Sequence, residues 1–175
     1  PTVDVVRRST AELPASAFLP RAQPRTFSGP GGREIHAFVY PPTHPEAAAP
    51  DGELPPYLAF VHGGPTAHVS PGLSLDKAYF TSRGIGVIDV NYGGSTGYGR
   101  AYRERLRRQW GVVDVEDTVA AVRALAEAGE ADGARLGIRG GSAGGWTTLA
   151  CLVFSDAFAA GAAYFPVTDL LPFAE

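Results

Sequence analysis

The residues best suited to chemistry in this sequence lie in the stretch GGSAG, at residues 140–144. This stretch matches the pattern G-x-S-x-G, in which a serine sits on a sharp turn between a strand and a helix. The preceding residues, ARLGIRG, are typical of a buried strand, and the following residues, GGWTTLACLVF, are typical of an apolar helix. The context therefore predicts that Ser142 is a nucleophile that attacks a carbonyl carbon.

A glycine-rich turn before a helix could also bind phosphate. Phosphate loops usually carry a lysine in the pattern G-K-S/T or the glycine spacing G-x-G-x-x-G. Neither pattern occurs at residues 140–145 or in the second glycine-rich stretch, NYGGSTGYGR, at residues 91–100. The sequence favours acyl transfer at Ser142 over phosphate binding.

Acyl transfer also requires hydrogen-bond donors for the negative oxygen that forms during the attack. One donor should be the backbone amide of Ala143, because it follows the nucleophile at the start of a helix. The second should come from a loop after an earlier strand, and HGGP, at residues 62–65, follows the apolar run YLAFV. We expect the amide of Gly64 to be this second donor.

A serine nucleophile also needs a histidine that takes its proton and a carboxylate that orients this histidine. In hydrolases with this turn, the carboxylate and the histidine follow the serine in the chain. The four histidines all precede it: His36, His44, His62 and His68. The carboxylates that follow it are Asp156, Asp169 and Glu175, and we expect none of them to be the catalytic acid.

Of the histidines, only His62 is expected near the site. Its simpler role is to hold the 62–65 loop by hydrogen bonds. The sequence thus predicts a nucleophile whose base is absent from this chain, and a chain that is inactive as a hydrolase by itself.

The elements that must position these residues alternate between strands and helices. A hairpin is expected within residues 25–42, followed by strands within residues 57–65, 85–92, 134–140 and 158–167. Helices are expected at residues 74–84 with Gly84 as the C-cap, at 101–109, from the N-cap Asp114 onward, and at 144–154. The alternation predicts an α/β fold with a mainly parallel sheet and helices on both faces.

The composition excludes several classes of protein. A net charge of −3 provides no broad basic surface for nucleic acid or anionic lipid, and no apolar segment is long enough to span a bilayer. The single cysteine, Cys151, lies in an apolar run and is expected to be buried in the core. We expect a cytoplasmic protein that needs no cofactor, because side chains and backbone amides suffice for the chemistry.

Five stretches together resemble the prolyl oligopeptidase family of serine peptidases: HGGP, NYGGSTGYGR, WGVVDVEDTVAAV, GGSAGGW and PVTDL. Their order and spacing are most similar to the acylaminoacyl-peptidase and dipeptidyl-aminopeptidase-like branch. The resemblance covers residues 26–175 and implies the N-terminal portion of an α/β-hydrolase domain, incomplete in this chain. Residues 1–25 would be a linker or the trailing edge of an upstream β-propeller.

The resemblance also implies roles for individual residues. Ser142 would form an acyl-enzyme with short peptides, and the amides of Ala143 and Gly64 would form the oxyanion hole. Some family members use a tyrosine hydroxyl where this chain has His62, so no side-chain donor is expected there. Tyr92 and Tyr98 flank a loop that the resemblance places near the active site, and either could contact the substrate.

Other interpretations stay open at this stage. A carboxylesterase or lipase uses the same serine turn and the same glycine loop, and a hydrolase-like domain without catalysis could serve as a binding module. Residues 1–25 favour the peptidase weakly. The five arginines within residues 100–108 could bind an acidic group, although a solvated helix face explains them more simply. Residue preference, exopeptidase or endopeptidase action, and oligomeric state are not predicted.

Overall fold

A computed structural model of the chain describes residues 4–7, 12–169 and 171. These residues contain one six-stranded sheet with the strand order β1-β2-β4-β3-β5-β6. Its strands are β1 (Gln23–Ser28), β2 (Glu34–Tyr40), β3 (Tyr57–Val61), β4 (Gly86–Asn91), β5 (Leu136–Gly141) and β6 (Ala160–Tyr164). The pairs formed by β4, β3, β5 and β6 are parallel, whereas β2 pairs antiparallel with β1 and β4. The expected mainly parallel sheet is confirmed.

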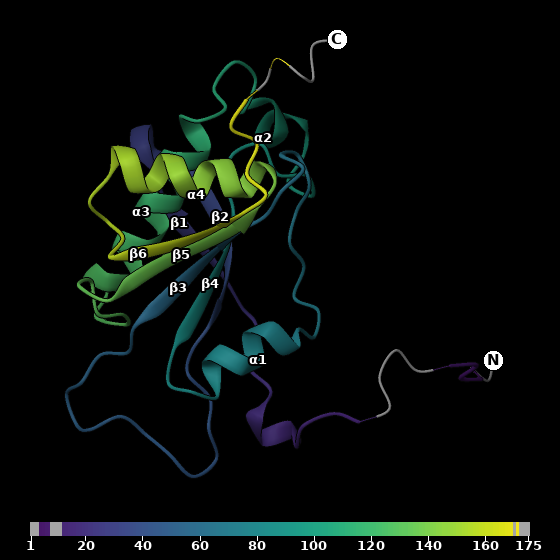
Figure 1. The fold of residues 1–175 in the computed structure, drawn as a ribbon, viewed down its shortest axis with the longest axis vertical. Helices are drawn as coiled ribbons and strands as arrows, with labels where there is room; N and C mark the ends of the chain where they lie inside the picture. Colours follow the sequence, from purple (N-terminus) through teal and green to yellow (C-terminus); the bar gives the residue numbers. More distant parts are fainter. Residues whose placement is uncertain (1–3, 8–11, 170, 172–175) are drawn as a thin grey trace.

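Four α-helices lie in the described part of the chain: α1 (Leu75–Thr81), α2 (Arg100–Glu104), α3 (Val113–Glu127) and α4 (Ala143–Phe154). Figure 1 shows α1 on one side of the sheet and α3 with α4 on the other. Both faces of the sheet therefore carry helices, as expected for this fold class. None of the helices in the described residues is long and apolar enough to cross a bilayer.

The core lies between the sheet and the pair α3 and α4. Every residue of β4 is buried, because this strand is central and is covered on both faces. Fully buried apolar side chains from the strands meet those of α3, among them Ile35, Val39, Ile88, Val90, Val122, Leu125 and Ile138. Cys151 of α4 is also fully buried, which confirms its predicted place in the core.

The N-terminal hairpin is also confirmed. β1 and β2 pair antiparallel around the turn at residues 29–32, in which Gly31 and Gly32 have φ values of 69° and 75°. β1 begins at Gln23, so the sheet already includes the end of the segment 1–25 that we assign to a linker. The boundary between the two domains stays a prediction.

α1 ends at Thr81 with Ser82 as the C-cap, so it is shorter than the helix expected up to Gly84, although Gly84 still takes part in the turn that ends it. Gly84 has a φ of 81°, and the amides of Gly84 and Ile85 donate back to the carbonyls of Thr81 (3.3 Å) and Phe80 (3.2 Å). This pattern of two bonds around a left-handed glycine ends helices in many proteins.

Two other expectations about helix ends are wrong. Asp114 is not an N-cap, because α3 already begins at Val113, and the Asp114 carboxylate lies buried between α3 and α4. The helix expected at residues 101–109 ends at Glu104, since the chain continues in short turns and Arg108 has a φ of 58°, outside the helical region.

Candidate active site

Ser142 lies between the end of β5 and the start of α4, with φ 57° and ψ −122°. L-residues rarely adopt this conformation, which costs about 1–3 kcal/mol and persists only where the surroundings enforce it. The Ser142 amide donates to the carbonyl of Tyr164 (3.0 Å), and the Ser142 carbonyl accepts from the amide of Trp146 (3.1 Å). The expected strained turn between a strand and a helix is confirmed.

The glycines of this turn are required by close packing. A Cβ atom on Gly140 would lie 2.4 Å from the carbonyl oxygen of Gly144, and one on Gly144 would lie 2.2 Å from the carbonyl oxygen of Val61. Atoms cannot approach so closely, so both positions must lack a side chain. The pattern G-x-S-x-G is thus explained by the contact of β5, α4 and β3.

The structure brings the glycine loop at residues 62–65 directly against this turn. A Cβ built on Gly63 would lie 3.3 Å from Ser142 Cβ and 3.8 Å from the amide nitrogen of Ala143. Gly64, which has a φ of 118°, follows in the same loop. Among the described residues, neither the Gly64 nor the Ala143 amide has a hydrogen-bond partner.

Ala143 is the first residue of α4, a helix of 12 residues, so the positive end of the helix dipole adds to its amide. The Ala143 amide therefore directly follows the serine, Gly64 follows the residue that packs against it, and both N–H groups lack a partner among the described residues. This arrangement can stabilise a negative oxygen next to Ser142.

His62 holds the glycine loop, as the sequence suggested. Its Nδ1 lies 2.8 Å from the carbonyl oxygen of Gly63, and its Nε2 lies 2.7 Å from Ser95 Oγ. The imidazole also stacks on the ring of Tyr92, with centroids 4.4 Å apart and planes inclined by 14°. Burial lowers the pKa of His62, which favours the neutral ring. Since both nitrogens are occupied, His62 is not available as the base for Ser142.

The two tyrosines near the site occupy different environments. Tyr92 is fully buried, and its hydroxyl donates to the carbonyls of Pro65 (2.8 Å) and His62 (3.1 Å). Burial raises the pKa of Tyr92, so the hydroxyl stays protonated. Tyr98 is half-buried, and its hydroxyl accepts from Asn91 Nδ2 at 3.0 Å. Tyr92 therefore lies beneath the glycine loop, whereas part of Tyr98 is open to solvent.

Sequence reasoning missed Asn91 as an anchor. This fully buried residue ends β4, and its side chain donates to the carbonyl of Val69 (3.1 Å) and accepts from the Val69 amide (2.8 Å). Together with the bond to Tyr98, these contacts tie the loop after β3 to the loop after β4. A polar residue at the end of an otherwise apolar strand is the signal that could have identified it.

Two buried carboxylates of α3 were also missed. Asp117 accepts from Arg33 Nε (2.6 Å) and from the Gly93 amide (2.8 Å), and Asp114 accepts from the Gly111 amide (2.6 Å) and Thr147 Oγ1 (2.5 Å). Burial is the main cause that raises the pKa of each carboxyl. The signal was available: Asp114 and Asp117 share a helical stripe with the buried Ala121 and Leu125.

No histidine or carboxylate in the described part of the chain is hydrogen-bonded to Ser142. Asp156 follows α4 and pairs with Arg123 on the surface, and the exposed Asp169 accepts from the Leu171 amide at 2.9 Å. Glu175 lies outside the described residues. The described residues thus contain Ser142 and the amides of Ala143 and Gly64, but no described histidine or carboxylate is hydrogen-bonded to the serine.

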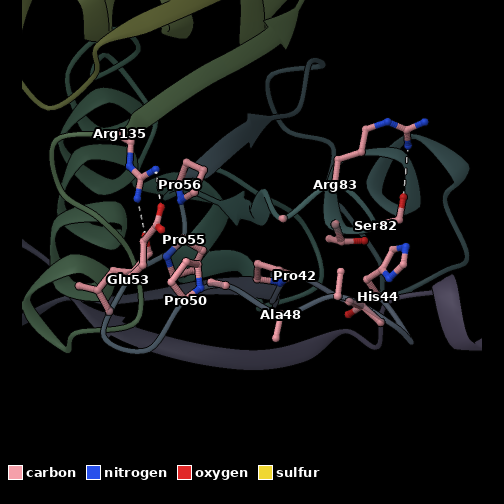
Figure 2. Close-up of a pocket in the computed structure, with 16 residues that line it drawn as sticks. Pro42, His44, Ala48, Pro50, Glu53, Pro55, Pro56, Ser82, Arg83 and Arg135 are labelled. Carbon is pink, nitrogen blue, oxygen red and sulfur yellow. Dashed lines mark hydrogen bonds and ion pairs between the residues drawn. The ribbon is translucent and has the colours of Figure 1, made fainter.

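A cavity of about 950 Å³ lies elsewhere, between the loop at residues 42–56 and the end of α1 (Figure 2). It is lined by Arg135, directly before β5, whereas Ser142 directly follows β5. The length of the strand therefore separates the two by about 20 Å. Arg135 Nη1 pairs with Glu53 at 3.1 Å, and Arg83 contacts Ser82 at 3.2 Å, as Figure 2 shows. This cavity is not part of the serine site.

Comparison with known proteins gives a consistent result. The sequence profile of the prolyl oligopeptidase family matches residues 71–175, more than half of the chain. A Caenorhabditis elegans protein described as dipeptidyl peptidase family member 6 is 33% identical over 144 residues, which cover 73% of this chain and 20% of that protein. An acylamino-acid-releasing enzyme of Arabidopsis thaliana is 38% identical over 122 residues, which cover 69% of this chain and 16% of that enzyme.

Solved structures of peptidases also match this chain. A puromycin-hydrolyzing peptidase of Mycobacterium tuberculosis superposes with a TM-score of 0.96 at 66% identity, covering 99% of this chain and 27% of that chain. An acylaminoacyl peptidase in complex with Z-Gly-Gly-Phe-chloromethyl ketone superposes with a TM-score of 0.78 at 27% identity, covering 87% of this chain and 24% of that chain. The chain thus spans about a fifth of the curated relatives and about a quarter of the solved chains it matches.

Proposed function

Because the chain belongs to the prolyl oligopeptidase family and has its α/β-hydrolase fold, we propose that it contains the nucleophile of a serine peptidase that cleaves short peptides. The observation that supports the proposal is the strained Ser142, with φ 57°, which precedes the Ala143 amide and packs against Gly63 of the glycine loop. Such a conformation exposes the serine oxygen at the end of a parallel strand, where α/β proteins bind their ligands.

We propose the following reaction at these residues. Ser142 Oγ attacks the carbonyl carbon of the substrate while a histidine takes the hydroxyl proton. The carbonyl oxygen becomes negative and accepts hydrogen bonds from the amides of Ala143 and Gly64. When the tetrahedral intermediate collapses, the C–N bond breaks, and the histidine returns the proton to the leaving amine. Water then hydrolyses the acyl-enzyme by the same steps.

We place the catalytic histidine and carboxylate outside these 175 residues. All four histidines of the chain precede Ser142. His62, which lies in the glycine loop, has both ring nitrogens in hydrogen bonds. The 175-residue chain alone is therefore expected to be inactive. We also propose that residues 1–25 connect to an upstream β-propeller.

The substrate class rests on the relatives. We propose cleavage of amide bonds in short peptides, and of puromycin, since puromycin-hydrolysing relatives are 59–66% identical to this chain. We propose Tyr98 as a substrate contact, because it lies in the glycine-rich stretch at residues 91–100 and is only half-buried, so that part of its side chain is open to solvent. The buried Tyr92 instead supports the glycine loop.

Neither a nucleic acid nor a membrane is proposed as a partner. We propose a cytoplasmic location, which subcellular fractionation tests.

The experiment uses the full-length protein, expressed from the gene extended to its natural ends. Treatment with a fluorophosphonate probe should label Ser142 alone, as mapped by mass spectrometry, and Ser142→Ala should abolish both labelling and turnover of a peptide anilide. A folded full-length protein without label would refute the nucleophile, and the binding module would then be the better description. A matched ester and amide pair separates a peptidase from an esterase.

A further inference from the structure

The Gly64 amide and the Gly63 carbonyl belong to the same peptide group. A peptide group is planar and almost always trans, so its N–H and its C=O point in opposite directions. Any group that holds the Gly63 carbonyl therefore also sets the direction of the Gly64 N–H. In this protein that group is His62, whose Nδ1 lies 2.8 Å from the carbonyl oxygen.

The hydrogen bonds of His62 define its tautomer. A carbonyl oxygen can only accept, so Nδ1 must carry the proton that is donated to Gly63. In a neutral imidazole Nε2 is then an acceptor, and the group 2.7 Å away from it is the hydroxyl of Ser95. Ser95 is fully buried and therefore donates its proton to Nε2. The lowered pKa of His62 is consistent with the neutral ring that this direction requires.

We propose that Ser95 is a positioning residue for catalysis, which acts through His62 to aim the Gly64 amide at the oxyanion. The inference rests on the proposed function, because it takes Gly64 as the second oxyanion donor. Stacking on Tyr92 fixes the plane of the His62 ring, and the Ser95 bond fixes its rotation within that plane. The glycine loop is tightly folded at this point, since Gly64 has a φ of 118° and a Cβ there would lie 2.7 Å from Ala67 Cβ. Contacts such as those of His62 are therefore needed to hold this conformation.

The first test is Ser95→Ala in the full-length protein. Loss of one oxyanion donor typically lowers kcat about 100- to 1,000-fold, and a donor that is only misaimed should cost less. We expect kcat for a peptide anilide to fall roughly 10- to 100-fold with KM changed less than about twofold, since the oxyanion forms only in the transition state.

The matched control is Thr96→Ala. Thr96 is the next residue of the same loop, and its hydroxyl contacts His68 on the exposed surface and not His62. We expect kcat within about twofold of the wild-type value. Equal kcat values in Ser95→Ala and Thr96→Ala would overturn the proposal.

The second test asks whether Ser95 acts through His62. His62→Phe keeps a ring that can stack on Tyr92 and removes both hydrogen bonds. If the effect of Ser95 passes through His62, adding Ser95→Ala to His62→Phe should lower kcat no further, because the two residues belong to one chain of contacts. Effects that multiply would mean that Ser95 acts independently, which contradicts the proposal.

A third measurement does not depend on activity. In full-length protein labelled with ¹⁵N-histidine, NMR should show His62 as the Nδ1–H tautomer, assigned by comparison with His62→Phe. Observation of the Nε2–H tautomer would overturn the proposal that Ser95 acts through His62, whether or not the enzyme is active. Wild-type protein without Ser142-dependent turnover would instead refute the proposed function, so the two failures are distinguishable.

Discussion

At the level of single residues, the site depends on positions where a side chain has no room. Gly140 and Gly144 let β5, α4 and β3 meet, and this contact holds Ser142 in its left-handed conformation. Ser142 is the residue that we expect to react, but the two glycines are required for its backbone conformation. Their effect should therefore appear in stability as well as in activity.

We predict that Gly144→Ala destabilises the full-length protein by about 3 kcal/mol or more, because the new Cβ would lie 2.2 Å from the carbonyl oxygen of Val61 and backbone must move. Gly133→Ala is the matched control, since its Cβ would contact only Ala126 Cβ at 3.5 Å. Urea denaturation measures both. If Gly144→Ala were as stable as Gly133→Ala, the close contact of α4 and β3 would be wrong.

The residues that we propose for catalysis could be identified in the sequence because each lies in a local pattern. Ser142 and Ala143 belong to one strand–turn–helix motif, and Gly64 belongs to a short loop after a buried strand. Asn91 could be singled out as a polar residue at the end of an apolar strand, but neither its partner nor that of Ser95 could be predicted in the same way. Their partners, Val69 and His62, lie in another loop, and nothing within a local window states which loops meet in the fold.

At the level of elements, buried polar bonds join helices to the sheet and to each other. The Asp114 carboxylate of α3 accepts from Thr147 of α4, and Lys77 Nζ of α1 lies 2.5 Å from Asp89 Oδ2 of β4. The strands and helices were predicted from hydrophobic periodicity, which reports only which face is apolar. A carboxylate does not fit the apolar face of a helix, so the pattern led us to interpret Asp114 as an N-cap.

We predict that Asp114→Asn becomes more stable relative to wild type as pH rises from about 4 to 7. Burial raises the pKa of Asp114, so the folded state binds its proton more tightly than the unfolded state does. Wild-type stability due to this group is therefore largest at low pH and declines as pH rises above the unfolded pKa of about 4. Asparagine does not titrate and can still accept from Gly111.

Urea denaturation of both proteins across this pH range measures the difference in unfolding free energy. Contributions from all other groups cancel in that difference. A difference that stays constant, or that moves in favour of wild type at higher pH, would contradict the assignment of Asp114 as a carboxyl whose pKa is raised by burial.

For α1, we predict that Lys77→Met destabilises the protein by about 3–5 kcal/mol, because it leaves Asp89 buried without a counter-charge. Both side chains are less than one-tenth exposed. The double variant Lys77→Met/Asp89→Leu should recover most of this loss. Arg123→Gln, which breaks the surface pair with Asp156, serves as the control and should cost less than about 1 kcal/mol. A Lys77→Met variant as stable as this control would contradict the prediction.

At the level of the whole molecule, the sheet is unevenly covered. β1 lies at one edge under α3, whereas β6 lies at the other edge with most of its residues exposed. Val153, Phe154 and Phe165 are more than two-thirds exposed near that edge. An open edge of a parallel sheet next to exposed aromatic side chains is a surface on which another chain can pair.

We therefore predict that the 175-residue chain, expressed alone, self-associates through β6, and that Ala162→Glu suppresses this association. Ala162 is an exposed residue of β6 that pairs in register with Arg139 of β5, so a glutamate there gains a cationic neighbour within its own chain. In a second copy the same carboxylate would be buried against an apolar edge, which is costly. Sedimentation velocity at several concentrations measures the change. Ala162→Glu should shift the distribution towards monomer while circular dichroism stays that of the parent chain, whereas an unchanged distribution would place the contact elsewhere on the surface.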